Sequence, residues 1–283
     1  MPAYNEEKSL QKFLPETIAF CNKKGYKLIV VNDGSTDNTL NELNKHSRES
    51  CLTILHNKMN AGYGAAIKNG IRHSETKYVV TLDADGQHRL DDVEKLYQVA
   101  LETDADMVVG DRGKASGRYR RLGKWFIRKT ASLLMPLPCS DINSGMKLYN
   151  AKLGKKYISI CPDTMAYSDI ILLTFVYKRC LVKEVPITIN PRTDGKSTIG
   201  MHTAMDTLRE IVNIVVLFDP IRIFFPLGTL LIAISLIWEA PIFFRGNGVS
   251  VGAMLGIITG FMLYFFGILA HQTGSFRKEM MEK

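Results

Sequence analysis

Cysteine is scarce in this chain of 283 residues, and none of its five cysteines has a partner at the CxxC spacing of zinc and redox sites. The cysteines are odd in number and scattered from Cys21 to Cys180. This pattern argues against a disulfide-rich scaffold and favours reduced thiols in the cytosol. The sequence also lacks a complete dinucleotide fingerprint, because Ile67 stands where a third glycine should follow Gly62 and Gly64.

Acidic residues are fewer than basic ones: 28 Asp and Glu accompany 36 Lys and Arg, giving a formal net charge of +8. The excess is concentrated in residues 110–130, where Asp111 is the one acid. A basic patch attracts phosphates, whether in nucleic acids, nucleotides or lipid headgroups. Because the segment has no interleaved aromatic platform, we do not expect a nucleic acid as partner. The basic residues are Arg112, Lys114, Arg118, Arg120, Arg121, Lys124, Arg128 and Lys129.

Short apolar runs alternate with amphipathic segments over the first 110 residues. The runs are rich in β-branched side chains, which is typical of buried strands, and helices are predicted between them, including 39–45 and 90–103. This alternation predicts an α/β fold with a mostly parallel sheet flanked by helices. Residues 141–149 also have a strand-like texture. The other predicted strands are 28–31, 52–55, 78–82 and 107–110.

Two carboxylates, Asp83 and Asp85, directly follow the predicted strand 78–82. In an open α/β sheet, ligands bind just beyond the carboxyl ends of the strands. Two acids there can share a hard cation such as Mg²⁺ or Mn²⁺ with a substrate diphosphate, and Gln87 can add a neutral oxygen. Asp33 follows the strand 28–31 in the same way, although an acid at this position can also simply cap the next helix.

An Asp-x-Asp pair is weak evidence by itself, because about one is expected by chance in a chain of this composition. A second pair, Asp104 and Asp106, precedes its strand, and we interpret it as a solvated turn. The metal and phosphate site at Asp83 and Asp85 is favoured because acids from two strand ends converge on one edge of the predicted sheet.

The last third of the chain has a different character. Residues 201–218 have the apolar periodicity of an interfacial helix, although a helix packed on a core fits the same pattern. Two uncharged runs follow, at 223–238 and 246–270. As helices they would be about 24 Å and about 37 Å long, against a hydrocarbon core of about 30 Å. They predict a transmembrane hairpin, and the alternative is a pair of buried helices in a soluble protein.

Basic residues lie outside the predicted hairpin, whereas the loop between its helices carries only Glu239 and Arg245 as charged residues. The positive-inside rule therefore places the amino-terminal domain and the C-terminus in the cytoplasm. The expected divisions are a catalytic domain at 1–199, an interfacial helix at 200–219, a hairpin at 220–272 with spans at about 221–240 and about 248–270, and a tail at 273–283.

Seven short motifs follow one another along the chain. They are Pro2-Ala-Tyr-Asn-Glu6, Asn32-Asp-Gly-Ser-Thr-Asp37, Asn60-x-Gly-x-Gly-x-Ala66, Asp83-Ala-Asp-Gly-Gln-His88, Gly110-x-Arg112, Asp141-x-Asn-Ser-Gly145 and Glu184-Val-Pro-Ile187. In this order the set resembles family 2 glycosyltransferases of the GT-A fold, and within them the polyprenyl-phosphate (dolichol-phosphate) mannose and glucose synthases. The resemblance covers nearly the whole chain.

The resemblance implies a role for each matching residue. The nucleotide base and ribose would be held by Tyr4, Glu6 and Asp33. A divalent metal, Mg²⁺ or Mn²⁺, would be bound by Asp85 and Gln87, with Asp83 beside it at the ribose or diphosphate. The acceptor phosphate would be met by Arg112 and by Arg120 or Arg121. The loop that closes over the donor would contribute Arg192, Lys196 and Ser197. The expected catalytic residues are thus Asp83, Asp85 and Arg112.

Three positions depart from the family pattern. An apolar strand normally precedes the Pro-Ala-Tyr-Asn motif, where here only Met1 stands; we expect the native protein to carry further N-terminal residues, which its intact mass would reveal. Asp111 stands where a small residue is more usual. The serine often found four residues after the acceptor arginine is replaced by Lys124 or Trp125.

The resemblance implies a metal-dependent, inverting transfer of a hexose from GDP-mannose or UDP-glucose to a polyprenyl or dolichyl phosphate at the cytoplasmic membrane face. The expected partners are the nucleotide sugar, the lipid phosphate and the bilayer, and a homo-oligomer stays open. The main alternative is a membrane-anchored scaffold with an inactive transferase domain. A processive polysaccharide synthase is disfavoured, because its Gln-x-x-Arg-Trp motif is missing. The sequence does not choose between the two donors.

Overall fold

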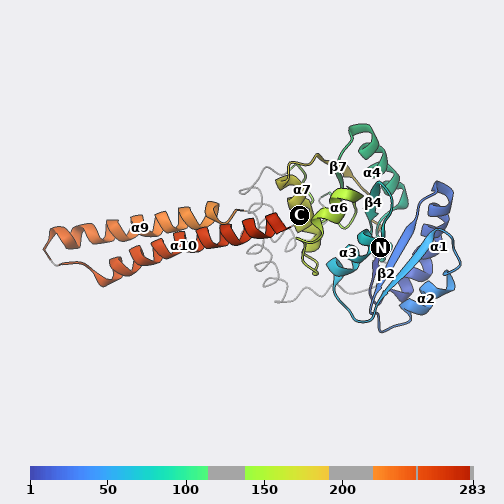
Figure 1. The fold of residues 1–283 in the computed structure, drawn as a ribbon, viewed down its shortest axis with the longest axis horizontal. Helices are drawn as coiled ribbons and strands as arrows, with labels where there is room; N and C mark the ends of the chain where they lie inside the picture. The colour runs from blue at the N-terminus through green and yellow to red at the C-terminus, as the bar shows by residue number, and fades with distance from the viewer. Residues whose placement is uncertain (114–137, 191–218, 247, 281–283) are drawn as a thin grey trace. The chain divides into compact units, whose positions relative to one another are not determined.

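The structure is a computed structural model that describes residues 1–113, 138–190, 219–246 and 248–280 (Figure 1). Tertiary contacts divide the described chain into two units. The first contains residues 1–113 and 138–190, and the second contains the rest. The predicted interfacial helix at 201–218 lies outside the described residues.

The first unit is an α/β domain in which helices and strands alternate (Figure 1). The four predicted strands of the first 110 residues are confirmed, and the helices at 39–45 and 90–103 have their predicted bounds. The elements are β1 (Pro2–Ala3), α1 (Glu7–Lys24), β2 (Leu28–Asp33), α2 (Thr39–Lys45), β3 (Leu52–Asn57), α3 (Tyr63–His73), β4 (Tyr78–Thr81), α4 (Leu90–Thr103), β5 (Met107–Asp111), β6 (Lys147–Asn150), α6 (Ala151–Tyr157), α7 (Tyr167–Tyr177) and β7 (Val182–Pro186).

The strands form two sheets, with the orders β1-β2-β3 and β4-β6-β5-β7. All described pairings within them are parallel except those of β6, which runs antiparallel to both β4 and β5. The predicted mostly parallel sheet flanked by helices is therefore confirmed, with one reversed strand. β7 lies at an edge, where Pro186 is tolerated because proline cannot donate to a ladder.

The first strand, β1, is only two residues long. It pairs with β2 through Pro2 and Val31 and through Ala3 and Asn32, and the N–H of Val31 donates to the carbonyl of Met1. No described strand pairs with the other side of β1. The resemblance implies an apolar strand before the Pro-Ala-Tyr-Asn motif, and in the described chain the short strand β1 stands at this place. The described strands form two separate sheets.

Apolar helix faces fix the strands in place. In α1, Leu10 and Leu14 are fully buried in a cluster with Val30 of β2, and the helix ends at Gly25, whose left-handed φ of 69° suits glycine. In α4, Leu96 is buried in a second cluster. With the strands held rigidly, the loops at their carboxyl ends are the part of the domain that can carry a site.

The segment before β6 differs from its prediction. The strand begins only at Lys147, and residues 141–146 contain a turn instead of strand. The residue pattern predicted a strand that begins at 141. Instead, polar groups of this segment bind a side chain, because Asp141 and the carbonyl of Asn143 accept hydrogen bonds from Arg112.

The second unit is a hairpin of two long helices, α9 (Ile221–Phe244) and α10 (Val251–Met280). Both are long and apolar enough to cross a membrane, and most of their apolar surface is exposed, as at Trp238 and Phe244. Soluble proteins rarely expose contiguous apolar surface of this extent, so a bilayer is the environment that fits. α9 extends beyond the predicted uncharged run 223–238 at both ends, whereas α10 begins five residues later than the run 246–270 and continues ten residues beyond its end.

Small residues let α9 and α10 approach closely. A Cβ on Gly228 would lie 2.8 Å from the carbonyl oxygen of Gly260, so a larger side chain would push the helices apart. Nearby, the hydroxyls of Thr229 and Tyr264 share a hydrogen bond of 2.8 Å. At the tip, both carboxylate oxygens of Glu239 accept the N–H of Ser250 at 3.1 Å, which places a negative charge at the N-terminus of α10.

Replacing Glu239 by alanine should destabilise the hairpin by about 1 kcal/mol, because the N–H of Ser250 loses its acceptor. Glu239→Gln keeps one acceptor oxygen and should lose less. Unfolding by SDS in mixed micelles, followed by the fluorescence of Trp238, measures both effects. An E239A midpoint equal to that of the wild type would show that the contact does not stabilise the hairpin.

Candidate functional site

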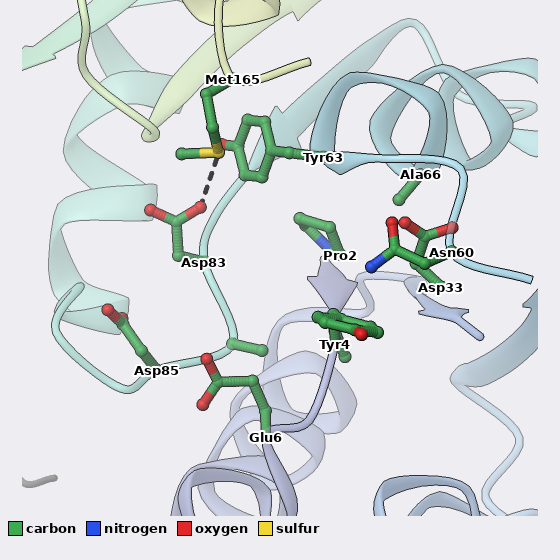
Figure 2. A pocket seen from close by; sticks show the side chains of 12 residues that line it. Pro2, Tyr4, Glu6, Asp33, Asn60, Tyr63, Ala66, Asp83, Asp85 and Met165 are labelled. Atoms are coloured by element: carbon green, nitrogen blue, oxygen red, sulfur yellow. Dashed lines mark hydrogen bonds between the residues drawn. The ribbon is translucent and has the colours of Figure 1, made fainter. Parts of the chain in front are cut away.

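A cavity of about 350 Å³ lies at the carboxyl ends of β1, β2 and β4, beside the start of α3 (Figure 2). Its lining combines acids, aromatic rings and one exposed methionine. It therefore offers both charged groups and flat apolar surfaces to a ligand. The lining residues with polar or large side chains are Tyr4, Glu6, Asp33, Asn60, Tyr63, Asp83, Asp85 and Met165.

Asp83 is held from several directions. The hydroxyl of Tyr63 donates to its Oδ1 at 3.0 Å, as Figure 2 shows. Burial, with the negative charge of Asp83, raises the pKa of Tyr63 well above its usual value, so the hydroxyl keeps its proton. The backbone N–H of Asp83 donates to Nδ1 of His88 at 3.2 Å. Because burial lowers the pKa of His88, the imidazole stays neutral at pH 7 and Nδ1 remains an acceptor.

Asp85 lies two residues further, on the turn between β4 and α4. Its Oδ1 accepts the backbone N–H of Gln87 at 3.1 Å, which fixes the turn, and Gly86 has a left-handed φ of 71°. Asp85 and Glu6 both line the cavity (Figure 2). Asp83 and Asp85 therefore line the same cavity at the end of β4, and the binding roles expected for them stay predictions.

The donor set fits a hard cation shared with a ligand. Among the described residues, no three His, Cys, Asp or Glu side chains are grouped as a self-sufficient metal site. Mg²⁺ and Mn²⁺ are commonly held by one or two carboxylates together with substrate phosphates. Asp85, with Asp83 and Gln87 close to it in the chain, offers oxygen ligands of this kind.

The loop after β1 is tied to the loop after β2. Asn5 adopts a left-handed φ of 54°, and its Oδ1 accepts the N–H of Thr36 at 2.8 Å. Its own N–H donates to Ser35 at 3.0 Å, and the N–H of Glu6 donates to Thr39 at 2.9 Å. These bonds leave Tyr4 45% exposed at the cavity, with its ring available to stack on a planar group.

Asp33 is buried and already bonded. Its Oδ1 accepts Asn57 Nδ2 at 2.7 Å and Ala61 N at 3.0 Å, and its Oδ2 accepts Gly62 N at 2.8 Å. Asp33 thus fixes the loop before α3. It does not cap α2, whose first turn is instead bonded by Asp37, which accepts the N–H of Thr39.

Arg112 follows β5 and is bound by a second segment. Its Nε and Nη2 donate to the two carboxylate oxygens of Asp141 at 2.6 Å and 2.9 Å, and Nη2 also donates to the carbonyl of Asn143 at 2.6 Å. This bidentate pair fixes the plane of the guanidinium. The contact joins two of the sequence motifs, and it was not predicted from the sequence.

Several expected residues lie outside the described part of the chain: Arg120, Arg121, Arg192, Lys196 and Ser197. Lys124 and Trp125 lie there too, so these roles stay predictions. Conversely, Tyr63, His88 and Asp141 were not predicted to act at the site, although each lies within a quoted motif. Asp104 and Asp106 form a turn as expected, with Asp106 accepting the N–H of Leu181 at 2.8 Å.

Replacing Asp33 by alanine should lower the free energy of unfolding by about 1–3 kcal/mol, because the N–H groups of Ala61 and Gly62 lose their acceptor. Asp33→Asn keeps one acceptor oxygen and should be intermediate. Urea denaturation in detergent measures the difference, with the exposed Asp91→Ala as control. Equal midpoints for D33A and D91A would contradict the assigned role.

His88 offers a sharper test, because asparagine can replace Nδ1 by its own Oδ1 whereas glutamine places its oxygen further out. His88→Gln should therefore speed amide exchange in residues 82–88 by about fivefold, as expected for a lost hydrogen bond of about 1 kcal/mol. His88→Asn should exchange nearly as slowly as the wild type. Hydrogen–deuterium exchange measures both variants, and equally fast exchange in the two would rule out the acceptor role of Nδ1.

Comparison with known proteins agrees with this geometry. Residues 1–158 match the family model described as Glycosyl transferase family 2. The chain is 26% identical over 224 residues to an undecaprenyl-phosphate 4-deoxy-4-formamido-L-arabinose transferase of Edwardsiella ictaluri, covering 75% of this chain and 66% of that protein. It is 28% identical over 234 residues to a dolichyl-phosphate beta-glucosyltransferase of Trichomonas vaginalis, covering 75% and 72%.

A solved structure shares the fold. Glucosyl-3-phosphoglycerate synthase of Mycobacterium tuberculosis, crystallised with Mn²⁺, UDP and phosphoglyceric acid, matches with a TM-score of 0.58 at 17% identity, over 76% of this chain and 75% of that one. The likeness at this identity concerns the fold, which is GT-A. The family model matches more than half of this chain, so the chain belongs to glycosyl transferase family 2 and is a glycosyltransferase.

Proposed function

We propose that the protein transfers a hexose from a nucleotide sugar to a polyprenyl or dolichyl phosphate, with inversion and with a divalent metal, at the cytoplasmic face of a membrane. The observation that carries this proposal is the pairing of a GT-A cavity, lined by Asp83 and Asp85, with a hairpin of exposed apolar helices. Two relatives whose names state a lipid-phosphate acceptor support the choice of acceptor.

On the donor side, the cavity provides for each part of a nucleotide sugar. Tyr4 offers a ring face to the base, and Glu6 and Asp83 offer carboxylates to the ribose and the metal-bound diphosphate. Asp33 supports them by fixing the loop that ends at Gly62. A divalent metal, held by Asp85 and Gln87, would neutralise the charge that develops on the departing nucleoside diphosphate.

On the acceptor side, no strong base is required. A phosphate monoester has its second pKa at about 6, so at pH 7 its oxygen is already largely an anionic nucleophile. Attack on the anomeric carbon from the face opposite the diphosphate gives a single displacement and inversion. Arg112, with its orientation fixed by Asp141, is the described cation that we assign to the acceptor phosphate, and Arg120 or Arg121 would add to it.

Replacing Asp85 by alanine should lower turnover by about 100-fold or more while leaving the fold intact, because the metal loses its carboxylate. The exposed Asp91→Ala is the matched control and should retain wild-type turnover. Titration with Mn²⁺ and nucleoside diphosphate by calorimetry gives an independent readout. Near-normal turnover and metal binding in D85A would remove the metal assignment.

The donor and acceptor are tested together by a screen of radiolabelled UDP- and GDP-sugars in detergent, with a short polyprenyl phosphate as acceptor and the unphosphorylated polyprenol as control. We expect labelled lipid with one nucleotide sugar and only with the phosphate, and a product anomer opposite to that of the donor. Donor binding without transfer or hydrolysis for any sugar would favour the inactive scaffold instead.

A further inference from the structure

Lys147 is a buried lysine in the middle of a sheet. It stands on β6, between Thr81 of β4 and Val109 of β5, and its side chain is 1% exposed. Lysine is almost never buried to this extent unless its ammonium is bonded and compensated. An apolar residue of similar length would fill the same space without that cost, so the charge requires an explanation outside packing.

The ammonium binds the turn that precedes its own strand. Its Nζ donates to the carbonyl of Ser144 and, at 2.5 Å, to the hydroxyl of Ser168 on α7. The hydroxyl of Ser168 in turn donates to the same Ser144 carbonyl at 2.7 Å. One backbone oxygen therefore receives two hydrogen bonds, one of them from a cation, and it is pinned between β6 and α7.

The pinned segment, residues 140–145, is called here the Arg112-binding turn. Its Asp141 and Asn143 hold the guanidinium of Arg112. Its far end is anchored separately, because Glu184 accepts the N–H groups of Ser140 and Asp141 at 2.6 Å and 3.1 Å. Lys147 thus anchors the other end of the turn, at Ser144, which is the end nearer to the cavity.

That end of the turn touches Asp83. A Cβ on Gly145 would lie 2.4 Å from Asp83 Oδ2, so the glycine backbone packs directly on the carboxylate. The carbonyl of Gly145 also accepts the hydroxyl of Thr81 at 2.8 Å. A shift of the turn would therefore move both Arg112 and the surface against which Asp83 rests.

We propose that Lys147 is a positioning residue whose buried ammonium fixes the Arg112-binding turn against Asp83. It does not touch the substrate; it acts through the Ser144 carbonyl on the two groups that do. The inference rests on the proposed function for its kinetic consequences, although the anchoring itself does not depend on the substrate.

The charge of Lys147 can be followed by pH. Burial and, to a smaller extent, the positive charge of Arg112 lower the pKa of Lys147 to about 8. The nearby Asp169, Asp141 and Cys139 act in the opposite direction and raise it. Below pH 8 the charged form predominates and holds the turn. Above pH 8 the neutral amine predominates, its hydrogen bonds weaken, and the positioning should be lost.

The test compares Lys147→Met, Lys147→Gln and the exposed Lys183→Met, a lysine on strand β7 of the same sheet. K147M should unfold near the wild-type temperature but lose about tenfold in kcat/KM for polyprenyl phosphate, a loss typical of second-layer residues. K147Q keeps a donor for Ser144 and should recover part of the loss, and K183M should lose nothing. The wild type should lose activity above about pH 8, and K147M should not show this decline.

Each outcome decides the proposal. Wild-type kcat, KM and pH profile in K147M would overturn it, as would an equal loss in K183M. If K147M fails to fold, K147Q and the wild-type pH profile decide, and wild-type activity that is constant from pH 7 to pH 9 would overturn it. If the wild type transfers no sugar to lipid phosphate, hydrogen–deuterium exchange of residues 139–146 still decides: faster exchange in K147M supports the anchor, and unchanged exchange refutes it.

Discussion

The position of the Asp83 carboxylate is the constraint on which the rest of the site depends. The hydroxyl of Tyr63 and the backbone of Gly145 contact the carboxylate itself, and the imidazole of His88 fixes the backbone N–H of the same residue. A carboxylate on a free loop would sample several rotamers. Binding a diphosphate or a metal would then cost the conformational entropy of fixing one of them. Here α3, the turn after β4 and the segment before β6 remove this freedom before any ligand binds.

The acids at the strand ends share a location but have different tasks. Asp33 accepts hydrogen bonds from an amide and two backbone N–H groups, so it shapes the loop before α3 in addition to lining the cavity. Asp83 is bonded by one tyrosine, and Asp85 stands on a turn that it helps to close. The hydrogen bonds that each carboxylate already accepts therefore distinguish these acids, a distinction that residue type cannot make.

The hairpin and the cavity serve one chemistry if the acceptor is a lipid phosphate. A phosphate on a polyprenyl chain is confined to the membrane surface, so an enzyme that uses it gains by being confined there as well. Exposed apolar side chains along α9 and α10, with close contacts at Gly228 and Gly260, provide such an anchor. The sequence also carries a cluster of basic residues between 114 and 129, a composition that attracts phosphate headgroups.

The sequence by itself determined the alternation of strands and helices, the placing of Asp83 and Asp85 at a strand end, and the apolar hairpin. These features follow from local periodicity and from short runs of neighbouring residues. Only the tertiary structure decided that Asp33 bonds the loop before α3, that Arg112 is held by Asp141, and that Lys147 is buried. Each of these depends on the packing of segments far apart in the chain, so no local pattern encodes it: Arg112 and Asp141 are 29 residues apart, and they meet only because β5 and β6 pair.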